Sequence, residues 1–427
     1  MTTVSVKKNF IFSFFEKVLR AALSFVSLGI VARYLGPEQY GTLSYLLALV
    51  SYFQLLGAFG LDHVLMRLFV AAPEKMDQTF WETIIFKSFF SLLSIIFYII
   101  FLLLNGEANT ISILFGISIL ASVFDNNRIF LETKNKHHVV AKIEIFYQII
   151  SAVLKIIFSR FDLGINLIFG LFILDFFVTK IIMYALVRHD VFPVNFKITF
   201  ERYTYYLKAG AFHCLSAILV IMYMKLDQVI LGRMMGMSAV GNYSAAVRIS
   251  DAWYFLPVTI SSVFFPMALD KQNEQKNSYL QIIFDLTIWV AIVIIGFSIA
   301  FSDEIFKLMF GNSFNINKQL LNLLFYSGFF ISLCVSTAAW LNIKGDRKVL
   351  FIRSLVGAFL NIILNLYLIP RYELIGCGVA TLVSYMVTFS LTFLHLESSE
   401  CKKYILESLK LMRVIERLNE FLIKKQN

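Results

Sequence analysis

Long apolar runs alternate with short polar stretches along almost the whole chain. A helix of about 20 apolar residues is long enough to cross the hydrocarbon core of a bilayer. The pattern therefore predicts an all-α membrane protein with about twelve transmembrane helices. They are expected at residues 10–31, 40–61, 84–104, 110–130, 139–158, 163–187, 209–231, 240–269, 280–301, 320–342, 349–369 and 374–396.

A sequence repeat relates the two halves of the chain. An offset of 200 residues aligns Ile30 with Ile230, Arg33 with Arg233, Gly36 with Gly236, Gly41 with Gly241 and Ser44 with Ser244. Each copy is an apolar run, a short Gly-containing turn and a second apolar run, which predicts a helical hairpin. Because an even number of helices separates the copies, both enter the membrane in the same direction, as in transporters with parallel repeats. This pattern favours alternating access, and the alternative is a duplication kept as a structural scaffold.

The polar stretch 188–208 divides the chain into two parts. We expect an N-terminal six-helix lobe at 1–187, a cytoplasmic linker at 188–208 and a C-terminal six-helix lobe at 209–396. The remaining tail, 397–427, is expected to be an amphipathic helix on the cytoplasmic surface, and it serves as an anchor in this interpretation. Its apolar positions at helical spacing are Ile405, Leu409, Met412, Ile415 and Leu418.

Composition and charge agree with a membrane protein. The chain is 59% hydrophobic and 15% charged, whereas soluble proteins carry about 25% charged residues. Most of the 38 Lys and Arg residues lie in loops on the side of the N-terminus, so both termini are expected to be cytoplasmic. This topology and anionic headgroups explain the net charge of +10 without nucleic acid as a partner. The four cysteines show no spacing typical of disulfides or metal sites.

Charged side chains inside the predicted helices are the candidate functional residues. Arg20, Lys225 and Arg248 lie too deep to reach the surface easily, and such cations usually face a cavity or a partner. We expect them to bind substrate in a shared cleft. The alternative is internal salt bridges, since Glu16 precedes Arg20 by four residues and Asp251 follows Arg248 by three. Lys17, Lys87 and Lys180 lie nearer helix ends and are expected to extend to the membrane surface.

Acidic residues also lie at depth in the predicted helices. Asp175 and Asp227 are candidates for coupling transport to an ion gradient, because buried carboxylates can carry protons or sodium. The alternative is that both are permanent counter-ions, the role we favour for Asp251. Pro257 and Pro266 lie within the predicted helix 240–269, where each removes a backbone hydrogen bond and permits a kink.

Two stretches resemble the signature hairpins of a known family. ARYLGPEQYGTLSYLLALVSYFQLLGAFGLD at 32–62 and YMKLDQVILGRMMGMSAVGNYSAAVRISDAWYFLP at 223–257 are similar to those of the polysaccharide transporter family, the O-antigen type lipid-linked oligosaccharide flippases. Their superfamily also contains multidrug and toxic-compound extruders. The resemblance implies a bacterial inner-membrane flippase that moves an undecaprenyl-pyrophosphate-linked glycan to the periplasmic leaflet. It also implies a cationic central cavity, to which Arg20, Lys225 and Arg248 correspond, and it makes the polysaccharide polymerase and chain-length machinery candidate partners.

Two other classes of protein remain as alternatives. A multidrug exporter of the same superfamily would require acidic or aromatic groups in its cleft, and the three deep cations count against it. An enzyme acting on polyprenyl-linked glycans would need catalytic residues in a sizeable periplasmic loop, yet the longest one expected, 302–319, contains no His. The chain also lacks a Gly-rich phosphate loop. We therefore predict neither an enzyme nor a cofactor.

Overall fold

The computed structural model describes residues 3–191, 199–269, 276–315 and 317–423, without the side chains of 3–21, 63, 223, 276 and 418–423. The described part of the chain is helical and contains no strand. By length and composition, nine of its helices can cross a membrane. The chain is therefore a multi-pass membrane protein of the all-α class.

The helices group into two compact units, which we describe separately. The N-terminal unit consists of Leu19–Gly232 with Gly236–Gly241, and the C-terminal unit takes in the start of α1, Arg233–Met235 and the chain from Asn242. The predicted linker 188–208 falls partly on residues 192–198, outside the described residues. The predicted lobe boundaries thus stay a prediction.

The first elements of the chain, up to α8, lie mainly in the N-terminal unit. They are α1 (Thr3–Ala58), α2 (Leu61–Ala71), η1 (Pro73–Lys75), α3 (Met76–Leu104), α4 (Thr110–Ile117), η2 (Ser118–Phe124), α5 (Asp125–Thr133), α6 (His137–Arg160), α7 (Ile165–Val187) and α8 (Phe200–Met235). The predicted helix 110–130 is therefore three shorter pieces, with the 3-10 turns of η2 in the middle.

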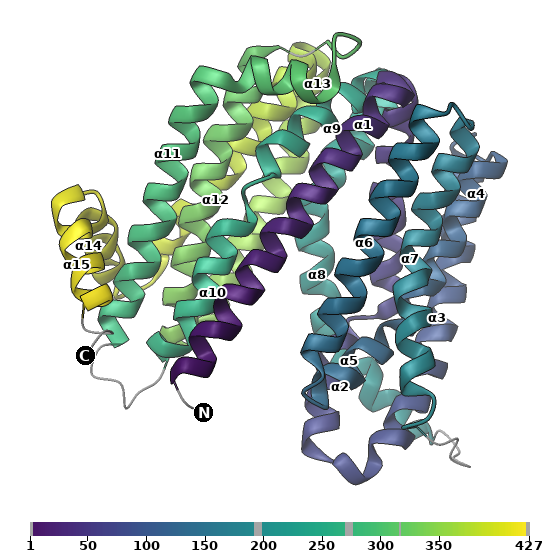
Figure 1. Ribbon diagram of the computed structural model, residues 1–427, viewed down its shortest axis with the longest axis horizontal. Helices are drawn as coiled ribbons and strands as arrows, with labels where there is room; N and C mark the ends of the chain where they lie inside the picture. Colours follow the sequence, from purple (N-terminus) through teal and green to yellow (C-terminus); the bar gives the residue numbers. More distant parts are fainter. Residues whose placement is uncertain (1–2, 192–198, 270–275, 316, 424–427) are drawn as a thin grey trace. The chain divides into compact units, whose positions relative to one another are not determined.

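The remaining elements belong mainly to the C-terminal unit. They are α9 (Met237–Asp251), α10 (Phe255–Leu269), α11 (Lys276–Phe310), α12 (Lys318–Lys344), α13 (Arg347–Ser390), η3 (Leu391–Leu394), α14 (Ser398–Ser408) and α15 (Leu411–Ile423). In this unit α10 to α13 run side by side, and α14 and α15 pack against α11 (Figure 1). The buried core of the unit includes Phe284, Leu333 and Trp340.

The prediction of one continuous helix at 240–269 was wrong. A turn at Ala252–Tyr254 separates α9 from α10. Pro257 lies in the first turn of α10, where its missing N–H costs no intrahelical hydrogen bond. The chain thus breaks just before this proline, while Pro266 lies inside α10.

Helix α3 shows how the N-terminal unit distributes its polarity. Its exposed residues include Ile85, Phe89, Leu92, Ile96 and Ile100, which recur at helical spacing. Its buried polar residues are Thr79, Glu82, Thr83, Lys87, Ser91 and Ser94. Apolar outside and polar inside is the arrangement expected of a helix that faces lipid, where buried polar groups find their partners within the protein.

Candidate functional site

The two copies of the sequence repeat touch each other at their second glycines, inside the N-terminal unit. A Cβ atom added to Gly41 would lie 1.8 Å from the carbonyl oxygen of Met237, and one added to Gly241 would lie 1.8 Å from that of Pro37. These contacts are reciprocal, because Pro37 and Met237 are themselves equivalent under the 200-residue offset. The backbones therefore cross about an approximate two-fold axis, as closely as only glycine permits.

The first glycine of each copy forms the turn. Gly36 breaks α1 with φ 70° and ψ 174°, and Gly236 ends α8 with φ 84° and ψ 176°. Both conformations belong to the region that favours glycine. The matching angles show that the sequence repeat is also a repeat of backbone conformation.

A charged cluster joins α6 to α7. Lys155 forms an ion pair with Asp175, and its ammonium nitrogen lies 3.9 Å from the ring centroid of Phe172. Oδ1 of Asp175 accepts hydrogen bonds from Tyr147 at 2.9 Å and from Ser151 at 2.7 Å. Three donors spaced four residues apart on α6 therefore surround one carboxylate of α7. Asp175, a predicted coupling residue, has a cation and two hydroxyl donors as direct partners.

A second charged cluster surrounds Lys87, whose side chain is fully buried. Its ammonium group lies 2.5 Å from Oδ1 of Asp62 and 2.7 Å from Oδ1 of Asn126. The expectation that Lys87 extends to the membrane surface was wrong, because these two acceptors hold it inside the unit. Lys180 likewise turns inward, to Oδ1 of Asp125 at 2.9 Å and to the carbonyl oxygen of Ala121 at 2.9 Å. The side chain of Lys17 lies outside the described residues.

A third cluster lies between the starts of α3 and α8. The Glu82 carboxylate is fully buried and faces Nε of Arg202 at 2.9 Å. It also accepts hydrogen bonds from the Tyr206 hydroxyl at 2.7 Å and from Nε2 of Gln78 at 2.9 Å. Its acceptor sites are thus occupied by protein donors, as a buried carboxylate requires. This cluster fastens the two helices to each other.

The other predicted site residues occupy different environments. The side chain of Arg20 lies outside the described residues. On α8, Lys225 is half-buried and Asp227 is buried, and Asp227 accepts a hydrogen bond from the backbone N–H of Gln228. Residues two positions apart on a helix point to different faces, so Lys225 and Asp227 are not neighbours on one face of α8. Arg248 is exposed on α9 and belongs to the C-terminal unit.

Comparison with known families gives the class of the protein. A family model described as polysaccharide biosynthesis protein matches residues 6–270. The chain belongs to this family. The match covers both hairpins of the repeat and agrees with the resemblance seen in the sequence.

Two relatives of this chain are named as a transporter and a flippase. A protein of Shigella flexneri named as an O-antigen transporter is 21% identical over 395 residues, which cover 88% of this chain and 94% of the relative. A protein of Haloferax volcanii named as a low-salt glycan biosynthesis flippase is 29% identical over 177 residues, which cover 40% of this chain and 37% of the relative. These relatives are transporters and flippases by name.

Solved structures show the same fold in two kinds of transporter. The lipid II flippase MurJ in its inward closed conformation has a TM-score of 0.70 at 18% identity, covering 94% of this chain and 93% of MurJ. An inward-facing multidrug resistance MATE family transporter of the MOP superfamily has a TM-score of 0.68 at 15% identity, covering 90% of this chain and 96% of the transporter. This polysaccharide biosynthesis protein therefore has the fold of the MurJ and MATE transporters.

Sequence reasoning missed several residues that form the charged clusters of this polysaccharide biosynthesis protein. Lys155 lies inside the predicted helix 139–158, but the sequence alone did not indicate its partner. Its signal was the spacing of Tyr147, Ser151 and Lys155 on one helix face, opposite a helix with a single internal acid, Asp175. No local signal joins Lys87 to Asp62, because 25 residues and the turn between α2 and α3 separate them.

Proposed function

We propose that this protein moves an undecaprenyl-pyrophosphate-linked glycan unit from the cytoplasmic to the periplasmic leaflet of a bacterial inner membrane. The observation that carries the proposal is the reciprocal contact of Gly41 with Gly241 in a member of the polysaccharide biosynthesis protein family. Two equivalent hairpins whose backbones cross at a pair of glycines can part and meet again, which suits alternating access between parallel repeats. Relatives named as an O-antigen transporter and a glycan flippase support this class of cargo.

The proposed architecture has twelve crossings in two six-helix lobes, at 1–187 and 209–396, with both termini in the cytoplasm. Two of the candidate spans, Ala22–Ala58 and Arg347–Leu394, are much longer than one crossing needs. Each contains a non-helical residue, Gly36 or Glu373, that divides it into two segments. Helix α6 adds 24 residues, which is enough for one more crossing. The excess of Lys and Arg in the loops on the N-terminal side supports the orientation.

The chemistry of the cargo explains the proposed binding residues. A pyrophosphate headgroup with sugars is anionic and hydrated, whereas its polyprenyl tail can stay in lipid. We assign Arg20, Lys225 and Arg248 to the headgroup, because guanidinium groups donate paired hydrogen bonds to phosphate and lysine offers a compact charge. The polysaccharide polymerase and the chain-length machinery are the partners proposed to receive the glycan.

Asp175 and Asp227 are the proposed coupling residues. Asp175 already neutralises Lys155, so a proton that binds Asp175 would release Lys155 from its ion pair and loosen α6 from α7. The competing interpretation is that Asp175 remains a permanent counter-ion.

The binding residues are tested by reconstituting the purified protein with a labelled lipid-linked glycan and following its arrival in the far leaflet. We expect Arg248→Ala and Lys225→Ala to lower the rate about ten- to a hundred-fold, because a hydrogen bond to a charged group contributes about 1.5–3 kcal/mol. Arg248→Lys should restore part of the rate. Arg371→Ala is the control, since Arg371 is also exposed and its guanidinium stacks on Tyr367 and bonds the Tyr367 carbonyl. An Arg248→Ala protein as active as the Arg371→Ala control contradicts the assignment.

The same vesicles test coupling when a pH gradient is imposed across them. We expect Asp175→Asn to bind the glycan but to transport it at a rate independent of the gradient. Asp303→Asn, at an exposed pair with Lys318, is the matched control. If the unmutated protein ignores the gradient, proton coupling is wrong. If Asp175→Asn also loses binding, Asp175 is a counter-ion.

The likeness to a MATE transporter keeps multidrug export as the second candidate function. That likeness is nearly as close in TM-score as the one to MurJ, so the fold alone does not separate the two. The family and the named relatives favour the glycan. The test is whether cells that express this protein accumulate less of a cationic dye. If they do, and the protein does not move the lipid-linked glycan between leaflets, multidrug export is the function.

A further inference from the structure

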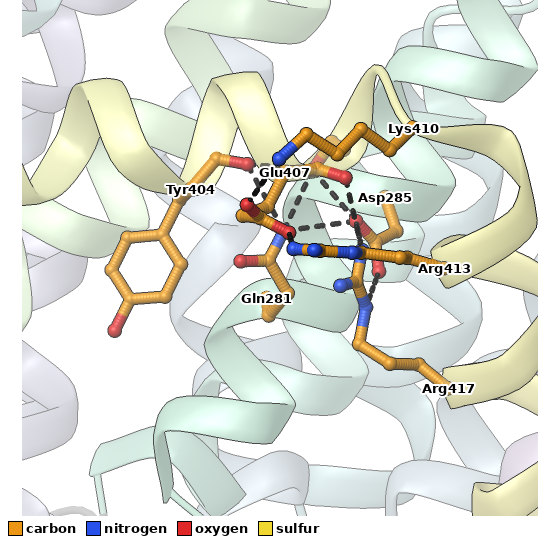
Figure 2. Close-up of polar contacts among 8 residues, drawn as sticks. Gln281, Asp285, Tyr404, Glu407, Lys410, Arg413 and Arg417 are labelled. Atoms are coloured by element: carbon orange, nitrogen blue, oxygen red, sulfur yellow. Dashed lines mark hydrogen bonds and ion pairs between the residues drawn. The ribbon is translucent and has the colours of Figure 1, made fainter.

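A buried carboxylate, Asp285 of α11, binds residues of both C-terminal helices, α14 and α15. Arg417 of α15 donates two hydrogen bonds to it, from Nε at 2.8 Å and from Nη2 at 2.9 Å. Ser408 of α14 donates a third at 2.7 Å, and Gln281 of α11 donates a fourth at 2.9 Å. Figure 2 shows Asp285 at the centre of these contacts, with Arg417 reaching it from α15. We call Asp285, Arg417, Ser408 and Gln281 the clasp.

The clasp lies beside the membrane-spanning part of α11. Gln281, Asp285 and Trp289 follow one another at intervals of four residues, and the indole N–H of Trp289 donates to the carbonyl oxygen of Ser408 at 2.8 Å. The candidate span begins at Asn277, and an α-helix rises about 1.5 Å per residue. The three residues therefore occupy roughly the first 18 Å of the span. In a bilayer of ordinary thickness this level corresponds to the headgroup region and the adjoining part of the hydrocarbon.

The part of the tail surface that the clasp does not cover is apolar. Val414 of α15 is buried, but Leu411, Met412 and Ile415 are 47%, 75% and 46% exposed. At about 100° per residue these four side chains share one half of the helix. Protein covers one edge of that apolar face, and the rest of it points away. Leu406 and Leu409 are also exposed, as are Leu394 and Leu396 just before the tail.

Charge on the tail also matches a membrane surface. Lys402 and Lys403 are exposed on α14, and Lys402 lies 5.2 Å from the ring centroid of Phe393. Lys410 and Arg413 both form ion pairs with Glu407, at 2.7 and 2.5 Å. These two cations are therefore partly neutralised within the protein and attract lipid phosphates less strongly. Insertion of apolar side chains therefore contributes more to membrane binding by the tail than electrostatic attraction does. The two lysines of α14 add contacts to lipid phosphates.

We propose that α14 and α15 form a collar that lies in the membrane interface and that the clasp holds at a fixed depth. Leu411, Met412 and Ile415 enter the boundary between headgroups and acyl chains of the leaflet next to the C-terminus. Lys402 and Lys403 contact its phosphates. The occupant of the uncovered apolar face is thus lipid, and the inference is independent of the cargo that the protein transports.

Spin labels on the full-length protein in nanodiscs test the depth of the collar. Met412→Cys places a label on the apolar face, and Arg413→Cys places the control on the exposed polar side of the same helix, about 200° around the axis from Leu411. Both replace exposed side chains, whereas the native Cys401 is fully buried and out of reach of the label. The remaining cysteines are replaced in both variants. The measurement is collision with oxygen, which dissolves in lipid, relative to a water-soluble nickel complex.

We expect the oxygen-to-nickel ratio to be several-fold higher at 412 than at 413, in neutral and in anionic lipid alike. Equal ratios at the two sites mean that α15 lies in water and overturn the proposal. Dipolar broadening of the label spectrum at 412 would mean that a label on a second copy of the chain lies close by. That result would overturn the proposal, because the apolar face would then be covered by protein. Asp285→Asn in the Met412→Cys protein tests the clasp, and it should increase the mobility of the label and lower its ratio. Unchanged mobility and ratio would mean that the clasp does not set the depth.

Discussion

The two units differ in how they hold charge. In the N-terminal unit, ion pairs join one helix to another, as in Lys87 with Asp62, Arg202 with Glu82 and Lys155 with Asp175. In the described part of the C-terminal unit, Asp285 of α11 and Lys344 at the end of α12 form ion pairs with residues in the tail region after α13. The first unit therefore fastens its own helices with ion pairs that contain a buried charge. In the described part of the second unit, the buried Asp285 fastens the tail, and the Lys318–Asp303 pair between α12 and α11 is exposed.

Several buried contacts in the described part of the C-terminal unit join neutral groups. The hydroxyls of Thr287 and Ser336 lie 2.5 Å apart between α11 and α12. Even Arg353, which is buried, binds the hydroxyls of Thr337 and Thr392 and the carbonyl oxygen of Cys334. A buried charge that loses its partner costs about 3 to 5 kcal/mol, whereas hydroxyl contacts in membrane proteins average about 0.6 kcal/mol. The N-terminal unit should therefore be the more sensitive to single substitutions.

The largest expected effect is at Asp62. Asp62→Asn leaves the buried Lys87 with only neutral acceptors, and we expect it to destabilise the protein by about 3 to 5 kcal/mol. Lys87→Met in the same chain removes the unpaired charge and should recover much of the loss. The midpoint of thermal unfolding in nanodiscs measures both variants. Asp303→Asn is the control, because exposed pairs contribute about 0.2–1 kcal/mol. A double variant no more stable than Asp62→Asn alone would count against the pairing.

A smaller effect is expected at Arg353 in the other unit. Arg353→Met removes the buried charge together with its hydrogen bonds. The former partners are neutral hydroxyl and carbonyl groups, some of which can form hydrogen bonds with one another. We expect a loss of about 1 to 3 kcal/mol, the cost of unsatisfied neutral groups, which is below that of Asp62→Asn. Ser336→Ala serves as the reference for a single hydroxyl contact. A midpoint that falls further for Arg353→Met than for Asp62→Asn would reverse the proposed difference between the units.

The smallest expected effect is a pH dependence of the tail. Hydrogen bonds from Lys410 and Arg413 lower the pKa of Glu407 from 4.5 to about 2. A carboxyl with a depressed pKa stabilises the folded state above its ordinary pKa, and this contribution disappears as the pH falls from about 4.5 toward 2. The mobility of a spin label at 412 should rise across this window. In Glu407→Gln the mobility should change less there, and an equal change in both proteins would assign the effect to another group.

Hydrophobic patterning was enough to predict the helical membrane class, because a spanning helix needs a long apolar run that is visible locally. The repeat predicted equivalent turns at Gly36 and Gly236, and the structure confirms matching backbone angles there. The break at Ala252–Tyr254 was not visible, because the apolar pattern runs through it and only Pro257 marks the site.

The charged clusters were much harder to predict from the sequence. A charge inside an apolar run is easily found, but the pairing of Lys87 with Asp62, or of Asp285 with Arg417, joins residues that come together only after the helices pack. Spacing on one helix predicts partners at three or four residues only. The proposed roles of Arg20, Lys225, Arg248, Asp175 and Asp227 stay predictions for the same reason.

The crossing of Gly41 and Gly241 has a consequence for how this chain can change over generations. A methyl group at either position would overlap the opposite carbonyl oxygen, so neither copy can accept a larger residue. The two glycines are therefore under one shared constraint, although 200 residues separate them. Two halves that began as copies are free to diverge across the lipid-facing surface, but where they touch they must remain alike. This point of contact preserves a trace of the ancestral duplication.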